Sequence, residues 1–220
     1  MYLRTAPGFA GFGRTQTATR CTNALDDKAK AIIAAAQDPS VGIFSRAVQV
    51  VWSILRTYYP TEATKVAAVV YSDSLSSGLQ TTRSGTGPTA TGTITVSRDF
   101  IDHTTAEFFA RRVLQVGHEL RHIDQYRAGM IGPANKAKRE FLAHCWTALA
   151  PDPPGTGCVS RATRVAIIDC ALAYCHCMSP AERRPYAKEE RRLLELRSQL
   201  QPRTPWPPPS GMPACPPPGC

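Results

Sequence analysis

Residues 104–126 read TTAEFFARRVLQVGHELRHIDQY, and this stretch decides the fold. Its apolar residues recur at steps of three and four, the spacing of one face of an α-helix: Phe109, Val113, Val116, Leu120 and Ile123. Thr104 followed by Glu107 is typical of a capping box, in which both side chains satisfy free backbone N–H groups at a helix start. The stretch therefore predicts one amphipathic helix that begins near Thr104 and ends at about Tyr126.

Two histidines lie on a different face of this helix from the apolar residues. Residues 118–122 read His-Glu-Leu-Arg-His, so His118 and His122 are four positions apart and both imidazoles can reach one tetrahedral ion. Glu119 then faces the open side of the metal, where it can accept a proton from water and deliver it to a leaving amine. The pattern predicts a Zn²⁺ site with Glu119 as catalytic base; the alternative is two surface histidines beside a solvated glutamate.

A catalytic zinc site needs a third protein ligand, and the next predicted helix offers two candidates. This helix is expected from about Ala134 to Leu149, and it carries Glu140 and His144 on one face. Glu140 is the predicted ligand, because a tight turn can return a carboxylate to the metal. His144 is predicted to be catalytic, as a hydrogen-bond donor to the oxyanion of a tetrahedral intermediate. A role as ligand, or simple packing beside Trp146, are the alternatives for His144.

The motif resembles that of the gluzincin metallopeptidases, and more closely the zincin-type peptidase domains of bacterial polymorphic toxins and contractile-injection effectors. Their motif often runs H-E-x-x-H-x-x-Q, and here the last position is Gln125. The resemblance covers roughly residues 93–150. It implies an α+β fold, a mainly helical zincin-like domain with a small sheet packed on the active-site helix. Thr93–Ser97 would then be the edge strand that aligns an extended substrate by backbone pairing.

The same resemblance implies an activity and a setting. The chain would be a zinc-dependent endopeptidase with a polypeptide substrate, delivered as a secreted or injected effector, with a cognate immunity or inhibitor protein as partner. Glu140 is followed by Phe-Leu-Ala-His, without the later Asp that some gluzincins carry. A zincin-fold binding module with structural zinc is the alternative function, although a purely structural site has no use for the base Glu119.

The rest of the chain predicts one domain between two tails. Helices are expected at Asp26–Gln37, Val41–Tyr59, Val159–Met178 and Pro185–Leu200, and strands at Lys65–Tyr71 and Thr93–Ser97, with a loop at Ser72–Gly92. The predicted boundaries are a flexible segment at 1–22, the peptidase domain at 23–200 and a Pro/Cys-rich tail at 201–220.

Composition narrows the classes of partner. A net charge of +9 favours acidic partners, but the basic residues are spread along the chain and are not interleaved with aromatic ones, so nucleic acid is not the expected partner. No apolar run approaches the roughly 18–20 residues of a membrane helix. The amino terminus lacks the apolar region of a secretory signal, so the protein is expected to be cytosolic, exported by another route, or cut from a larger chain. Of these, the resemblance favours delivery through a specialised secretion system.

Eight cysteines indicate an oxidising compartment, which such delivery can provide. Cys170, Cys175 and Cys177 together with His176 suggest a second metal site, but the C-x4-C-x-C spacing lacks the C-x2-C step of a tight thiolate turn. Disulfides or buried thiols are therefore expected.

Three further side chains are candidates near the metal. Asp124 can orient a metal-bound imidazole or be surface charge, and Tyr126 and Tyr71 are candidate oxyanion donors.

Overall fold

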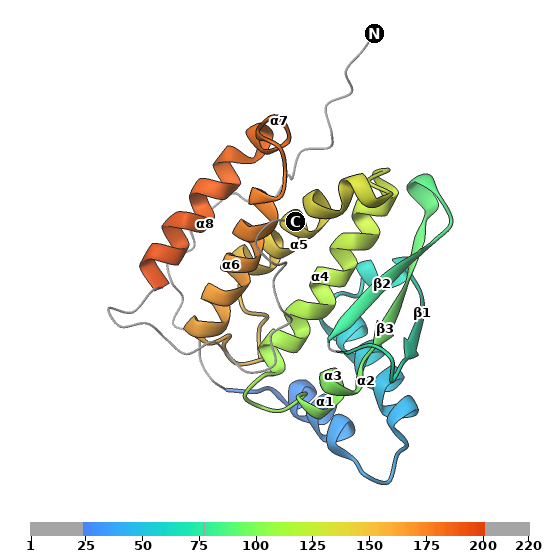
Figure 1. Cartoon of the computed structure of the whole chain (residues 1–220). Coiled ribbons are helices and arrows are strands. Elements are labelled where there is room, and N and C mark those ends of the chain that lie inside the picture. Colours follow the sequence, from blue (N-terminus) through green and yellow to red (C-terminus); the bar gives the residue numbers. More distant parts are fainter. Residues whose placement is uncertain (1–23, 77, 201–220) are drawn as a thin grey trace.

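The computed structural model describes residues 24–76 and 78–200, and these form an α+β fold (Figure 1). The predicted tails at 1–22 and 201–220 lie outside the described residues. The helices are α1 Asp27–Gln37, α2 Ile43–Tyr58, α3 Arg98–Asp102, α4 Phe109–Arg127, α5 Lys136–Leu149, α6 Arg161–His176, α7 Pro180–Arg183 and α8 Ala187–Leu200. Apart from the helix predicted at 104–126, the five predicted helices agree with α1, α2, α5, α6 and α8 to within about three residues at each end.

Helix α4 begins later than predicted, and the capping box is wrong. The helix starts at Phe109 and has no side-chain cap. The Thr104 hydroxyl is buried and donates instead to the carbonyl of Phe100, at 2.7 Å, because residues 98–102 form the short helix α3. Ser97 caps that helix by accepting from the Phe100 N–H at 3.2 Å. Thr104 therefore completes the end of α3 and does not cap the start of α4.

The sheet has three strands: β1 Val66–Tyr71, β2 Leu79–Ser84 and β3 Thr91–Val96. Their order is β1-β3-β2, with β1 parallel and β2 antiparallel to β3. Strands β1 and β3 confirm two predictions, and β3 alternates buried and half-buried residues as expected. Two other predictions are wrong: the segment Ser72–Gly92 contains β2, and the strand predicted at Thr93–Ser97 is the central strand rather than an edge.

Helix α4 lies between the sheet on one side and α5, α6 and α8 on the other (Figure 1). Two close approaches hold it there. A Cβ at Gly117 would lie 2.3 Å from the Trp146 ring of α5, and a Cβ at Gly92 of β3 would lie 2.5 Å from the Ile123 side chain. Only glycine permits these contacts, since real Cβ atoms do not approach other heavy atoms so closely. Helix α4, which carries His118 and His122, is therefore packed closely against α5 on one side and the sheet on the other.

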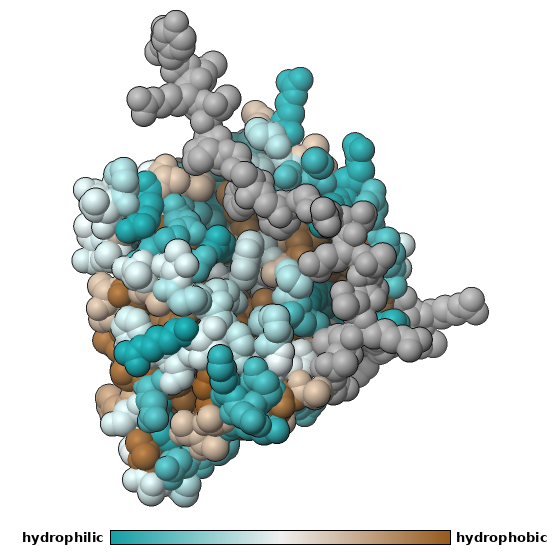
Figure 2. Space-filling view, turned by 180° about the vertical axis from the view of Figure 1, so that it is seen from behind, coloured by the Kyte–Doolittle hydropathy of each residue, from teal (hydrophilic) through white to brown (hydrophobic). Residues whose placement is uncertain are grey.

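Apolar side chains fill one core between α4, the sheet, α1 and α2, and a second between α5, α6 and α8. In the part of the chain that the structure describes, the large apolar side chains left exposed come from four different segments: Phe44, Val70, Ile131 and Leu194. The face opposite to that of Figure 1 mixes hydrophilic and hydrophobic residues (Figure 2). Among the described helices, none has both the length and the apolar character needed to cross a membrane.

Candidate metal centre

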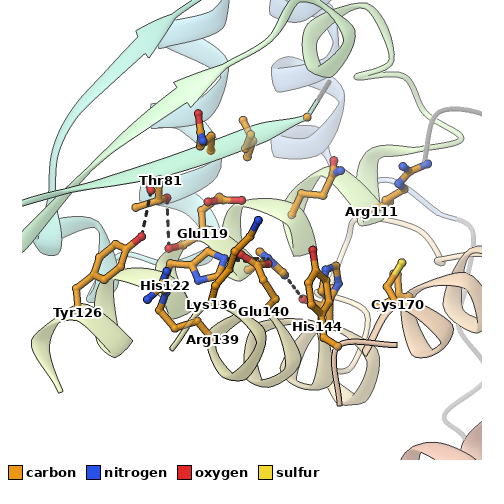
Figure 3. Close-up of a pocket in the computed structure, with 18 residues that line it drawn as sticks. Thr81, Arg111, Glu119, His122, Tyr126, Lys136, Arg139, Glu140, His144 and Cys170 are labelled. Carbon is orange, nitrogen blue, oxygen red and sulfur yellow. Dashed lines mark hydrogen bonds and ion pairs between the residues drawn. The ribbon is translucent and has the colours of Figure 1, made fainter. Parts of the chain in front are cut away.

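A cleft of about 380 Å³ opens between β2, α4, α5 and α6 (Figure 3). The turn from α4 to α5 returns the chain to this cleft, and it uses Gly129 and Gly132 in the left-handed region, with φ of 80° and 81°. Helix α4 contributes His118, Glu119 and His122, and α5 contributes Glu140 and His144. The structure therefore brings all five predicted site residues to one cleft.

The three predicted metal ligands lie at the separations that one tetrahedral ion requires. Nε2 of His118 is 3.2 Å from Nε2 of His122, and Oε2 of Glu140 is 3.7 and 3.6 Å from these two atoms. A tetrahedral ion with bonds of about 2.0–2.1 Å places its ligand atoms about 3.3–3.4 Å apart. Two imidazole nitrogens and a carboxylate oxygen are also a donor set that zinc accepts, so the residues fit the ion.

Glu119 lies beside this trio. Its carboxylate and the ring nitrogens of His118 and His122 fall within 4.8 Å of one another. Glu119 and His122 are each only 7% exposed. A pair of surface histidines with a solvated glutamate does not describe these residues, because a side chain in that arrangement would be open to water.

The first histidine is held by a threonine of α5. Nδ1 of His118 lies 3.3 Å from Oγ1 of Thr147, and the Thr147 hydroxyl donates to the carbonyl of Ala143 at 2.9 Å. Since the hydroxyl hydrogen is already used, Oγ1 accepts and Nδ1 of His118 carries the proton. This tautomer leaves the lone pair of Nε2 free for a metal.

The second histidine is held by the glutamine of the motif. Nδ1 of His122 lies 2.9 Å from Oε1 of Gln125, and the Gln125 amide donates to the carbonyl of Arg139 at 2.9 Å. That carbonyl can only accept, so it fixes the amide with its oxygen toward His122. Gln125 thereby keeps a proton on Nδ1 of His122, and Nε2, which faces Glu140 and His118, is the nitrogen that would give up its proton to bind a metal.

The carboxylate and the second histidine form a charged pair. Burial alone would raise the pKa of Glu140, but hydrogen bonds from His118 and His122 outweigh it and hold the pKa well below its usual range. Burial alone would lower the pKa of His122, but its hydrogen bond to Glu140, the charge of Glu119 and other contacts raise that pKa to about 9. The raised pKa of His122 reflects the two carboxylates that face it, Glu140 and Glu119, and carboxylates in this position suit a cation.

His144 lies at the edge of the same cluster. Its ring centroid is 4.6 Å from that of His118, and its ring stacks on Tyr174 of α6 with the centroids 5.6 Å apart. Burial and the neighbouring His118 lower the pKa of His144 to about 3, so its imidazole is neutral at pH 7. Its nitrogen lies within 4.8 Å of those of His118 and of the Glu140 carboxylate. This position suits both a ligand and a hydrogen-bond donor, and it contradicts simple packing beside Trp146.

The weaker candidates separate clearly. Asp124 pairs with Lys65 at 2.6 Å and with Arg121 at 3.2 Å, so the surface-charge alternative fits it and a role in orienting an imidazole does not. Tyr71 donates to Asp73 and does not line the cleft, which contradicts its role as an oxyanion donor. Tyr126 does line the cleft and donates to the Thr81 carbonyl at 3.3 Å.

Sequence reasoning missed four contributors: the role of Gln125, the role of Thr147, the ring of Tyr174, and residues 78–81 at the start of β2. Gln125 lies three positions after His122, a helical spacing that could have revealed its role. Thr147 and Tyr174 meet the site only through packing of α5 and α6, so no local pattern marks them.

The cysteines of α6 do not form a second metal site. Cys170 and Cys177 are disulfide-bonded, as is Cys158, and Cys175 is a buried free thiol. A sulfur in a disulfide has no thiolate to offer a metal. The expectation of disulfides or buried thiols is confirmed for these residues, and the fifth described cysteine, Cys145, is also a buried thiol.

Comparison with known proteins finds no matching family model, curated protein or solved structure. Function is therefore inferred from the geometry of the cleft.

Proposed function

We propose that the chain is a zinc-dependent peptidase whose metal is held by His118, His122 and Glu140. The observation that carries the proposal is the set of ligand separations, 3.2, 3.6 and 3.7 Å, with Glu119 buried beside it. Three protein donors leave the fourth position of a tetrahedral ion open, which is the arrangement of catalytic zinc. When bound, the ion supplies Lewis-acid polarisation of a substrate carbonyl and lowers the pKa of water.

Glu119 is the general base and acid of the proposed reaction. Its carboxylate accepts a proton from the attacking water and then delivers that proton to the leaving amine nitrogen. His144 donates a hydrogen bond to the carbonyl oxygen as that oxygen gains negative charge, and a neutral imidazole suits this task because it keeps an N–H to donate.

Strand β2 is proposed to align the substrate. Among the described residues it pairs with β3 alone, and the segment 78–81 lines the cleft. An edge strand offers backbone N–H and C=O groups to an extended polypeptide. Strand β2 then has the substrate-aligning role that the sequence analysis expected for residues 93–97.

A binding module with structural zinc is the second candidate, and the position of His144 favours it. If His144 were a fourth protein ligand, the ion would have no open position, as in structural zinc sites. The burial of Glu119 against the two histidines favours the enzyme, because a structural site gains nothing from an extra buried carboxylate.

The setting is proposed to be oxidising. Cys158, Cys170 and Cys177 are disulfide-bonded, and disulfides persist outside the reducing cytosol. This supports a secreted or injected effector, whose cognate immunity or inhibitor protein would be its natural partner.

One experiment tests the proposed function directly. The purified chain is analysed for metal and then incubated with a broad peptide library, before and after treatment with a chelator. We expect close to one zinc per chain, cleavage of peptides, and loss of cleavage on chelation with recovery when zinc is added back. Zinc without any cleavage would favour the binding module, and the absence of zinc binding would overturn both candidates.

A further inference from the structure

The lining of the cleft is rich in positive charge next to the metal centre. Its basic residues are Arg111, Lys136 and Arg139, and its acidic residues are Glu119 and Glu140. The two carboxylates face the metal centre, so a bound divalent cation would neutralise them. In the zinc-loaded cleft, the charges of Lys136 and Arg139 are then available to a ligand.

Lys136 and Arg139 lack a carboxylate partner among the residues that the structure describes. Some basic side chains elsewhere pair with a carboxylate, such as Lys65 with Asp124 at 2.6 Å. Lys136 takes part in no ion pair within the described ranges, although it is one helical turn from Glu140. Lys136 is exposed and Arg139 is half-buried, so both charges are open to an anion that enters the cleft.

Arg139 is held in place without using its charge. Its Nη1 donates to the carbonyls of Met130 and Gly132, at 3.3 and 2.9 Å, and its guanidinium lies over the ring of Tyr126. These contacts fix the side chain at the α4–α5 turn while leaving it cationic. Figure 3 shows Lys136 and Arg139 on the helix that carries Glu140. We call Lys136 and Arg139 the basic rim.

We propose that the basic rim selects polypeptides with an Asp or Glu close to the bond that is cleaved. The inference rests on the proposed peptidase function and names the substrate class of that site. Lys136 lies four residues before Glu140, about 6 Å along the helix axis. An extended chain advances about 3.3 Å per residue, so an anion that meets Lys136 lies within about two residues of the carbonyl at the metal.

The test measures binding separately from turnover. Zinc-loaded Glu119→Gln protein is titrated with pairs of fluorescent peptides that differ only in Asp or Glu against Asn or Gln at one position. We expect the acidic member to bind about three- to fivefold more tightly, the scale of a partly exposed ion pair. Lys136→Gln on the same background should abolish this preference. Zinc content is measured in every variant first, and Lys136→Arg should keep both zinc and preference.

Lys138→Gln is the matched control. It removes the same charge from the same helix, but Lys138 lies 5.7 Å from the Tyr186 ring and does not line the cleft. It should keep the preference for acidic peptides. Equal binding of the paired peptides, or a preference that survives in Lys136→Gln, would overturn the inference. Tighter binding of a single-stranded oligonucleotide than of the acidic peptides would overturn it too, and would assign the rim to nucleic acid.

A library digest with the parent protein separates the two levels of proposal. Cleavage sites enriched in neighbouring Asp or Glu support the inference, and cleavage without that enrichment contradicts it alone. If the library is not cleaved at all, the peptidase proposal fails, while the binding titration still decides whether the rim recognises acidic polypeptides.

Discussion

The side-chain oxygen of Gln125 lies 2.9 Å from Nδ1 of His122, and the same amide donates to the carbonyl of Arg139, one residue before Glu140. This one buried side chain therefore joins a proposed ligand on α4 to the helix that carries Glu140, the third proposed ligand. It sets the tautomer of His122 and also the position of the first turns of α5. The motif glutamine is thus a positioning residue for two of the three donors.

Gln125→Ala should weaken zinc binding by about 10- to 100-fold, the usual effect of removing a hydrogen-bond partner of a metal-bound histidine. The physical reason is that Nδ1 of His122 loses its acceptor and α5 loses one tie to α4. Competition with a chromophoric chelator measures the affinity. Gln80→Ala is the control, because Gln80 lines the cleft from β2 and, in the described part of the chain, has no hydrogen bond to His118, His122 or Glu140. An unchanged affinity in Gln125→Ala would contradict this role.

The two histidines of α4 should carry most of the metal affinity. The purified chain should hold close to one zinc, and His118→Ala or His122→Ala should lose most of it, because two donors alone bind zinc weakly. Metal analysis after dialysis against a mild chelator gives the stoichiometry. His103→Ala is a control, since His103 pairs with Asp99 and does not line the cleft. Full zinc occupancy in the double variant His118→Ala/His122→Ala would remove the basis of the metal centre.

Glu119→Gln should keep zinc and lose turnover. The amide preserves size and polarity but cannot accept a proton at neutral pH, so kcat should fall by roughly 10²–10⁴ with zinc content unchanged. Steady-state cleavage of a library-derived peptide, alongside metal analysis of the same sample, provides the measurement. If this variant cleaves as fast as the parent, Glu119 is not the base and the structural-zinc candidate gains weight.

The thiols of Cys145 and Cys175 should resist alkylation while the chain is folded. Burial raises the pKa of Cys145 to about 12 and that of Cys175 to about 11. At pH 8 their thiolate fractions are then on the order of 10⁻⁴ and 10⁻³, and only the thiolate reacts. Iodoacetamide followed by peptide mapping should label neither position in buffer and both in denaturant. Rapid labelling of either in the folded chain would contradict the packing between α5 and α6.

The part of the site that the sequence predicts is the part encoded by local spacing. His118 and His122, and likewise Glu140 and His144, are four residues apart on helices whose apolar periodicity is clear, so their faces follow from helical geometry. The meeting of the two helices also follows, because a short glycine turn joins them.

The failures have a common physical cause, which is competition from the tertiary fold. Strand β2 is polar and buries only Thr81, since an edge strand packs on one face, and it therefore resembles a loop in the sequence. Thr104 belongs to the end of α3 rather than the start of α4. Asp124 lies two residues after the HExxH motif, but its carboxylate accepts a hydrogen bond from Lys65, which is 59 residues away in the sequence. Thr147 reaches His118 from a different helix, so no local pattern could reveal that contact.

The identity of the third proposed ligand is the sharpest test of the proposed metal site. Helix α5 offers two donors one turn apart, Glu140 and His144. Oε2 of Glu140 lies within 3.7 Å of both histidine nitrogens, and hydrogen bonds from these histidines hold the carboxylate ionised. His144 is placed against His118 and Tyr174, and burial keeps its imidazole neutral. A carboxylate also offsets part of the charge of a divalent ion, which a neutral imidazole does not.

Glu140→Ala should therefore weaken zinc binding strongly, whereas His144→Ala should keep zinc and mainly slow turnover, by roughly 10²–10³ if it removes a single oxyanion donor. Chelator-release rates on the two single variants compare the ligands, and kcat on His144→Ala measures its part in the reaction. Glu140→Gln is a useful third variant, because it keeps the size of the side chain while removing its charge. If His144→Ala loses zinc and Glu140→Ala keeps it, the ligand set is His118, His122 and His144, and Glu140 becomes a charged neighbour rather than a ligand.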